Sequence, residues 1–456
     1  MPTNNAQPLP RHKVIFYSLT EIPLALALFP VLVYVPKYYG SNLGIDLAMV
    51  ANVLLITRLL DVVTDPLIGY LSDRTKTRWG RRKPWIAAAA PVLMVSFYKL
   101  FVPPDDAGWM YLFGWMALMW TGLTMILIPY YAWAAELSDD YNERSYITGW
   151  RSAMGVVGSF LAQLLPTIAA AAFAFEGTRE NLIVVAGTML VLMPVCVLLS
   201  LSQVEEPKSN HSAQVPLIAG IKLMLSNGPF KRLVLTFMLG QTALSMTTPL
   251  YIFFIAFVLQ AENNAVYMLL CFYTTNLLAI PFWVWLSKQI GKHRAYVCSF
   301  LLIASAHPFY LLLGAGDFWW MLPITIATGF SAGAFYALPN SMKADVIDLD
   351  TIKSGENRAA LFFSTWSLTM KGGASLGGWI ALYGLSLWGF DATPGGTNSP
   401  EQLFGLRFLF ALLPSAFFVT AAAIVWKYPI TEARHAEMRA ELEQRNSNSA
   451  AGTLSV

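Results

Sequence analysis

The stretch at residues 58–85, RLLDVVTDPLIGYLSDRTKTRWGRRKPW, decides the fold. Its first half is apolar enough for a membrane helix yet carries Arg58, Asp61 and Asp65, and its second half is strongly basic. These three charged residues share one face of a helix, because they are three and four positions apart. Each ionisable residue inside a membrane span costs about 2.5–3.5 kcal/mol on insertion scales, so the cluster indicates a functional site.

The whole chain has the composition of an integral membrane protein. Of its 456 residues, 56% are hydrophobic and only 12% are charged, against about 25% charged in an average soluble protein. The basic residues stand in short loops rather than on one continuous face, which argues against nucleic-acid binding. The three cysteines lie in apolar segments without ligand spacing, so they predict neither disulfides nor a metal site.

Apolar segments long enough to cross a bilayer recur along the chain, since a helix needs about 20 residues for this. We predict an all-α membrane protein with twelve spans, near 14–36, 44–71, 85–103, 109–135, 147–174, 182–202, 231–259, 265–288, 294–314, 318–343, 359–389 and 404–427. The predicted organisation is an N-terminal six-helix half, a cytoplasmic central loop, a C-terminal six-helix half and a cytoplasmic tail, at 1–202, 203–230, 231–428 and 429–456.

The distribution of basic residues predicts the orientation. Nearly all loop lysines and arginines fall on one side of the twelve-span arrangement, and such loops face the cytoplasm. We therefore expect a multi-pass protein of a bacterial inner membrane with both termini in the cytoplasm, and we expect a monomer.

The two halves contain similar features at an offset of about 210 residues. Pro129 leads to Glu136 after the fourth span, and Pro339 leads to Asp345 after the tenth. Two parallel, pseudo-symmetric six-helix halves describe the major facilitator fold.

Several motifs carry a family resemblance. Gly69, Asp73 and Arg74 with GRRK at 80–83 resemble the loop between helices 2 and 3 of the major facilitator superfamily. The DVVTDP, KPW, IPYYAW, ADVID and MKGG motifs resemble the glycoside-pentoside-hexuronide:cation symporter family, which includes melibiose permease. The resemblance implies Na⁺- or H⁺-coupled import of a glycoside, sugar or sugar acid by alternating access.

Two carboxylates on one helix face suit a small hard cation or a proton. We predict that Asp61 and Asp65 bind the coupling cation, Na⁺ or H⁺, and we predict no other cofactor. The resemblance implies Thr64 and Thr124 as further oxygen ligands. Arg58 is one of the buried bases that can balance the charge of the buried acids. A purely structural ion pair with Arg58 is the alternative for the two aspartates.

Buried charges and aromatic rings predict the substrate site, and the candidates are Glu21, Arg151, Tyr131, Lys371, Tyr336 and Trp366. Glu21 and Arg151 could bind solute hydroxyls or an anionic group. Lys371 is expected to reach the aspartate pair between the halves. Mutual pairing of the charges and simple packing of the aromatic rings stay open as alternatives. Leu127 stands where galactoside transporters have an acid, so a galactoside is less favoured.

The basic loop also predicts an intracellular gate. Its simpler role is to set the topology. Beyond that, we expect ion pairs across the interface between the halves, with Glu136, Asp139 or Asp345 as the acidic partners; the gate residues are Asp73, Arg74, Arg78, Arg81, Arg82, Glu136 and Asp345.

The sequence supports other functions less strongly. A transporter of the same fold for an amphiphilic or lysolipid-like solute is the first alternative. A receptor or enzyme is remote, because the sequence contains no HExxH, no GxSxG and no nucleophile–base pair at plausible spacing. We therefore predict that the protein is not an enzyme and that its partners are a small solute, a monovalent cation and the bilayer.

Overall fold

The computed structural model describes residues 10–138, 141–173, 178–206, 222, 226–354, 359–393 and 396–429. Within these ranges the regular elements are helices, and an isolated bridge joins Thr77 to Gly80. The chain forms two compact units. The N-terminal unit comprises Met1–Gln214 with Gly389–Asn398, and the C-terminal unit comprises Val215–Trp388 with Ser399–Val456.

The N-terminal unit contains six membrane-length segments, two of which are broken. Its helices are α1 (Arg11–Ser18), α2 (Glu21–Lys37), α3 (Leu47–Leu59), α4 (Asp61–Arg74), α5 (Lys83–Phe101), α6 (Trp109–Glu136), α7 (Tyr141–Phe173) and α8 (Thr178–Gln203). The first predicted span is interrupted at Leu19 and Thr20, and the second at Leu60.

The C-terminal unit repeats this plan. Its helices are α10 (Gly228–Phe253), α11 (Ala265–Ile290), α12 (Lys292–Ala306), α13 (Met321–Ser354), α14 (Ala359–Leu387), α15 (Pro400–Arg407) and α16 (Leu413–Trp426), with short π or 3₁₀ turns between some of them. Its core is rich in aromatic rings, including Phe300, Phe335 and Phe418.

The helices have the length and composition of membrane spans. Ten segments of the described chain are long and apolar enough to cross a bilayer. Two further helices, α7 with 33 residues and α14 with 29, are also long enough to cross a bilayer but contain more polar and small residues than those ten segments. Ten segments and these two helices make the predicted twelve. The predicted all-α membrane fold is confirmed.

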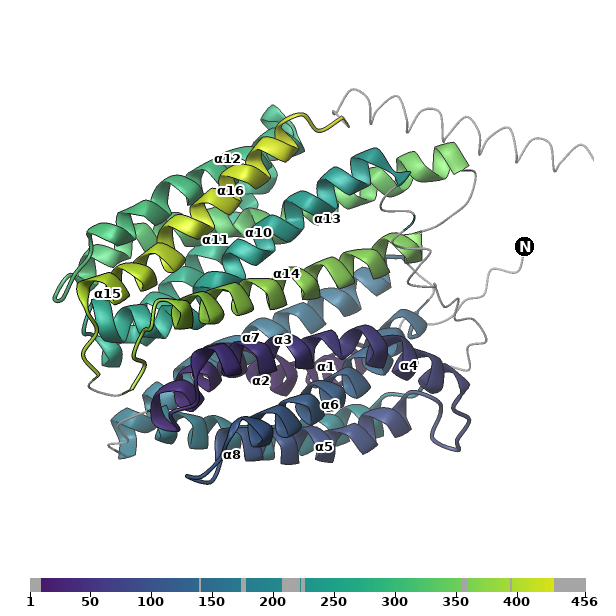
Figure 1. The fold of residues 1–456 in the computed structure, drawn as a ribbon. Helices are drawn as coiled ribbons and strands as arrows, with labels where there is room; N and C mark the ends of the chain where they lie inside the picture. Colours follow the sequence, from purple (N-terminus) through teal and green to yellow (C-terminus); the bar gives the residue numbers. More distant parts are fainter. Residues whose placement is uncertain are drawn as a thin grey trace, which may run out of the picture. The chain divides into compact units, whose positions relative to one another are not determined.

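Helix packing shows the internal repeat directly. In the N-terminal unit α2 lies against α7 and α8, α3 and α4 lie against α6, and α5 lies against α6 and α8. In the C-terminal unit the equivalent pairs recur: α10 lies against α14 and α16, α11 against α13, and α12 against α13 and α16. Figure 1 shows each unit as a bundle of long helices. The two halves therefore share one packing scheme, as predicted.

Equivalent glycines allow the closest helix contacts. A Cβ atom added at Gly158 of α7 would lie 2.2 Å from the carbonyl oxygen of Ile22 in α2. At Gly377 of α14 it would lie 2.2 Å from the carbonyl oxygen of Thr242 in α10. Only glycine lets the backbones of these helix pairs approach so closely.

Candidate functional site

The break between α3 and α4 brings an arginine and an aspartate together. Arg58 Nη1 donates to Asp61 Oδ2 at 3.1 Å, and both side chains are largely buried, at 19% and 4% exposed. The Arg58 guanidinium also lies over the ring of Trp120 in α6, 3.2 Å from its centroid. The buried charge is thus balanced by a carboxylate and an aromatic face. The ion pair that the sequence leaves open as a structural alternative is present for Asp61.

The second aspartate of α4 contacts a different helix. Asp65 is one helical turn after Asp61, and Thr124 Oγ1 of α6 donates to Asp65 Oδ1 at 3.1 Å. Trp120 precedes Thr124 by one turn, so the same face of α6 contacts Arg58 at the end of α3 and Asp65 in α4. Thr64 Oγ1 is buried without a hydrogen-bond partner in the described part of the chain. The predicted cation ligands therefore gather within one unit.

The donor set of this site is made of oxygens. Among the described residues no group of three or more His, Cys, Asp or Glu side chains gathers as a metal-ligand set. The aspartate pair instead offers two carboxylates, one of which accepts a hydrogen bond from the Thr124 hydroxyl of α6, and Thr64 lies between the two aspartates in the sequence of α4. Hard cations take oxygen ligands, so this chemistry fits a monovalent cation or a proton and does not fit a soft transition metal.

Three predicted substrate residues form one contact group, which we call the Glu21 cluster: Glu21 on α2, Tyr131 on α6 and Arg151 on α7. Tyr131 Oη donates to Glu21 Oε1 at 3.0 Å. Arg151 Nε lies 3.8 Å from Glu21 Oε2, and the guanidinium lies over the Tyr131 ring, 4.0 Å from its centroid. The sequence predicts each residue separately, and the fold brings them together.

Glycines of α7 set the spacing of this cluster. A Cβ added at Gly155 would lie 3.2 Å from Glu21 Cγ, and Gly158 faces the Ile22 carbonyl one turn later. Close approach of α7 to α2 is what brings Arg151 within reach of Glu21. Leu127 lies one turn before Tyr131 on α6, and as an apolar residue it adds no charge to the Glu21 cluster.

The basic loop after α4 forms a buried network. The Arg82 side chain is only 2% exposed. Its Nη1 lies 2.5 Å from Asp73 Oδ1 and donates to Ser72 Oγ at 3.0 Å. Its Nη2 lies 3.0 Å from Glu136 Oε1. Arg81 Nη2 also contacts Glu136 Oε1, at 2.8 Å. The predicted pairing of loop arginines with Glu136 is therefore present, but it lies inside the N-terminal unit and not across the interface between the halves, because the end of α6 lies beside the loop of its own unit.

The sequence analysis missed Glu206 as the acidic partner that organises this loop. Its carboxylate accepts the backbone N–H groups of Arg81 at 2.9 Å, Arg82 at 3.0 Å and Lys83 at 3.3 Å. These amides start α5, where backbone donors lack helical partners and a negative charge is favourable. Gly80 has φ +106°, and a Cβ there would lie 2.1 Å from Glu206 Oε2. An acidic pair, EE at 205–206, among basic loops is the signal that could have found it.

The other gate residues have local contacts. The Arg74 guanidinium lies over the Tyr70 ring, 4.1 Å from its centroid, and Arg78 is exposed. Asp345 forms an ion pair with Lys292 at 2.7 Å inside the C-terminal unit.

The remaining predicted residues are less informative. Trp366 packs in the core of the C-terminal unit, with its ring centroid 4.2 Å from that of Phe237, and this contact favours the packing alternative. Lys371 lies on α14, and its approach to the aspartate pair stays a prediction. The Tyr336 side chain and Asp139 lie outside the described residues.

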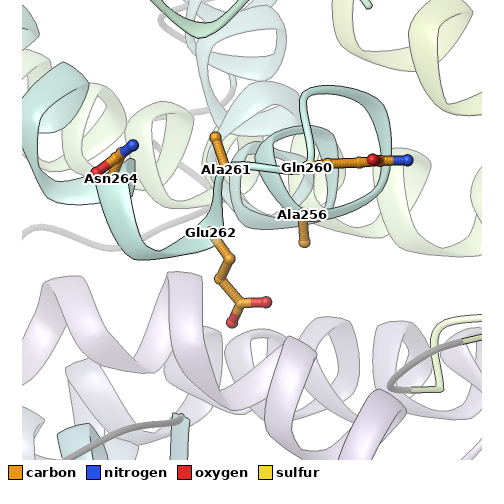
Figure 2. Close-up of a pocket in the computed structure, with 5 residues that line it drawn as sticks. All are labelled: Ala256, Gln260, Ala261, Glu262 and Asn264. Carbon is orange, nitrogen blue, oxygen red and sulfur yellow. The ribbon is translucent and has the colours of Figure 1, made fainter. Parts of the chain in front are cut away.

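The C-terminal unit has a pocket in the segment between α10 and α11. Figure 2 shows its lining residues, which are Ala256, Gln260, Ala261, Glu262 and Asn264. These residues come from 256–264, the segment that joins α10 to α11, and none is a predicted site residue.

Comparison with known proteins identifies the family. A family described as MFS/sugar transport protein matches residues 16–432. The chain belongs to this family. The family resemblance that the motifs indicate is therefore confirmed, and the chain is a multi-pass membrane transporter by family and fold.

Relatives of this MFS transporter include proteins named for different solutes. It is 24% identical to a glucuronide carrier protein homolog of Escherichia coli (strain K12), covering 96% of this chain and 97% of that protein. It is 25% identical to an uncharacterised symporter of Synechocystis, over 89% and 91%. It is 25% identical to the human sodium-dependent lysophosphatidylcholine symporter 1, over 86% and 78%.

Solved structures agree on the fold. The nucleoside transporter NupG aligns with a TM-score of 0.68 at 12% identity, covering 92% of this chain and 99% of NupG. A bacterial homolog of the human lysosomal transporter Spinster aligns with a TM-score of 0.66 at 13% identity, covering 92% and 97%. Both alignments support the major facilitator fold for this MFS transporter.

Proposed function

We propose that the protein is a cation-coupled symporter that imports an anionic glycoside, a sugar acid, by alternating access. The geometry of Arg151 carries this proposal. The Arg151 guanidinium lies over the Tyr131 ring. The distance from Arg151 Nε to Glu21 Oε2, 3.8 Å, is too long for a hydrogen bond. The described part of the chain accepts no hydrogen bond from this guanidinium. Its planar fork of N–H donors matches the two oxygens of a carboxylate.

The charge of the cluster also favours an anion. Glu21 and Arg151 offset each other, and Leu127 replaces the second acid that would repel a solute carboxylate. Two relatives support an anionic solute, since one is named for a glucuronide and the other for lysophosphatidylcholine. Both compounds carry an oxyanion.

A lysolipid is the second candidate solute. Several relatives are named sodium-dependent lysophosphatidylcholine symporters, and one from Gallus gallus is 27% identical over 87% of this chain. A phosphate would bind the Arg151 fork as a carboxylate does.

The coupling cation is assigned to Asp61 and Asp65, with Thr64 and Thr124 as neutral oxygen ligands. The ion pair with Arg58 is compatible with this role, because a carboxylate has about four lone-pair positions and can share a cation while keeping one partner. Na⁺ and H⁺ are both consistent with these ligands. We further assign the protein to a bacterial inner membrane with its termini in the cytoplasm; in this orientation the Arg82 network lies on the cytoplasmic side.

Proteoliposome uptake tests the proposal. We would compare a labelled glucuronide, a neutral β-glucoside and lysophosphatidylcholine, with Na⁺ and proton gradients imposed separately. Arg151→Lys keeps the charge but loses the fork, so glucuronide uptake should fall about tenfold or more. Arg179→Lys is the control, because Arg179 is half-exposed and pairs with the exposed Asp105.

Two results would contradict the proposal. If none of the labelled solutes accumulates under either the Na⁺ gradient or the proton gradient, symport is excluded. Preference for the neutral glucoside, with Arg151→Lys unchanged, would exclude an anionic solute.

A further inference from the structure

We infer that Tyr17 and Tyr130 are positioning residues that hold the Glu21 cluster in its solute-binding arrangement, an inference that rests on the proposed function. The two residues exchange hydrogen bonds. Tyr17 Oη donates to the Tyr130 carbonyl at 2.6 Å, and Tyr130 Oη donates to the Tyr17 carbonyl at 2.9 Å. Their rings stack with centroids 4.5 Å apart, and both side chains are fully buried.

The break between α1 and α2 explains why this pair is needed. In a continuous helix the amide of Glu21 would donate to the carbonyl of Tyr17, four residues earlier. Here the helix is interrupted at Leu19 and Thr20, and the Tyr130 hydroxyl donates to that carbonyl. This contact ties α6 to the backbone just before the turn at Leu19 and Thr20, beyond the turn's own hydrogen bond, in which the Ile22 amide donates to the Leu19 carbonyl at 3.1 Å.

Consecutive residues of α6 hold both sides of the break. Tyr130 binds the backbone of Tyr17 before the break, and Tyr131 binds the Glu21 carboxylate after it. Because Tyr130 and Tyr131 are adjacent on a rigid helix, the two contacts fix the position of Glu21 relative to α6. The same Tyr131 ring supports Arg151, so the tyrosine pair also sets where the guanidinium lies. A preorganised donor fork binds its ligand more tightly than a mobile one.

Removal of single hydroxyl groups tests the inference. Tyr17→Phe and Tyr130→Phe keep the stacked rings and remove one hydrogen bond each. Tyr39→Phe is a matched control, because Tyr39 is buried in the same unit and donates to the Leu100 carbonyl at 3.0 Å. For each full-length variant we would measure the thermal unfolding midpoint, the Kd for phenyl glucuronide and the Na⁺ affinity of the solute-free protein.

We expect similar falls in the unfolding midpoint for all three variants, because each loses one buried hydroxyl bond to a carbonyl. The Kd for phenyl glucuronide should rise about fivefold to tenfold only in Tyr17→Phe and Tyr130→Phe, with Na⁺ affinity unchanged. Equal Kd values in these variants and in Tyr39→Phe would overturn the inference alone. A wild-type protein that binds neither glucuronide, glucoside nor lysophosphatidylcholine would overturn the proposed function and the inference with it.

A double variant separates positioning from a general effect. If Tyr130 acts through Tyr131, adding Tyr130→Phe to Tyr131→Leu, which removes both the hydroxyl bonded to Glu21 and the ring under Arg151, should leave the Kd of the single Tyr131→Leu variant unchanged, because coupled residues are not additive. Additive losses of affinity would overturn the inference.

Discussion

Thr124 on α6 donates a hydrogen bond to the Asp65 carboxylate on α4, and the two oxygens lie 3.1 Å apart. Thr124→Val removes the hydroxyl and keeps the shape of the side chain. We expect cation affinity of the solute-free protein to fall about tenfold, which corresponds to about 1.4 kcal/mol. Na⁺ titration with proton release as a second readout measures this. Thr124→Ser should retain affinity, and a Val variant with wild-type affinity would exclude Thr124 as a ligand.

The two aspartates of α4 should respond differently to neutralisation. Asp61→Asn breaks the buried pair with Arg58, and loss of one partner of such a pair typically costs about 3–5 kcal/mol of stability. Asp65→Asn leaves that pair intact, so the protein should stay folded and lose cation-stimulated uptake. Thermal unfolding and proteoliposome uptake separate the two effects.

A double variant is the control for Asp61. Arg58→Met combined with Asp61→Asn removes both charges and should recover much of the stability lost in the single variant. Undiminished cation stimulation in Asp65→Asn would contradict the assigned cation site.

The close contact at Gly158 of α7 means that adding one methyl group there should strongly reduce stability. In Gly158→Ala the new Cβ would meet the Ile22 carbonyl at 2.2 Å, so α2 and α7 must separate. We expect a loss of about 1–3 kcal/mol in unfolding free energy and a weaker solute Kd, because Arg151 moves away from Glu21. Gly149→Ala on the same helix meets no atom within 4 Å and should be neutral or slightly stabilising. Equal behaviour of the two variants would argue against the close packing.

Glu206 offers a test of the basic loop. Glu206→Ala removes the acceptor of three backbone amides at the start of α5, and we expect a loss of about 1–3 kcal/mol in unfolding free energy. Glu205→Ala is the adjacent control, since the Glu205 side chain is 93% exposed and pairs only loosely with Lys13 at 3.7 Å. Chemical or thermal unfolding of the two variants in detergent measures the difference. If both variants unfold alike, Glu206 does not stabilise the loop.

The span pattern and the buried charges were predictable from sequence. Hydropathy and loop charge depend on local composition, so the twelve segments and the candidate residues Asp65, Glu21 and Arg151 follow from single stretches of chain. The contacts within the Glu21 cluster depend on the close approach of α7 to α2 at Gly155 and Gly158. The role of these glycines cannot be read from the sequence, because it depends on which helix packs against them.

Other features could not be predicted for physical reasons. The helix break at Leu60 occurs at a residue that does not disfavour helix as Pro or Gly do, so local propensity gives no signal there. The break at Leu19–Thr20 does have a local signal, because Pro23 lacks the amide that would donate to the Leu19 carbonyl four residues earlier. Glu206 meets the amide of Arg81 across 125 positions of sequence, a contact that only tertiary structure creates. Glu136 pairs inside its own unit because α6 ends beside the loop that follows α4.

The neutral Glu21 cluster has a consequence for the energetics of uptake. With one acid and one base, the site itself adds no net charge to a bound solute. An anionic solute carried with one monovalent cation therefore crosses the bilayer as an electrically neutral load, and the membrane potential performs no work on it. A neutral glycoside with the same cation would instead gain about 2.3 kcal/mol per 100 mV. Uptake of a sugar acid by this transporter would accordingly follow the two concentration gradients and be insensitive to a valinomycin-imposed potassium diffusion potential.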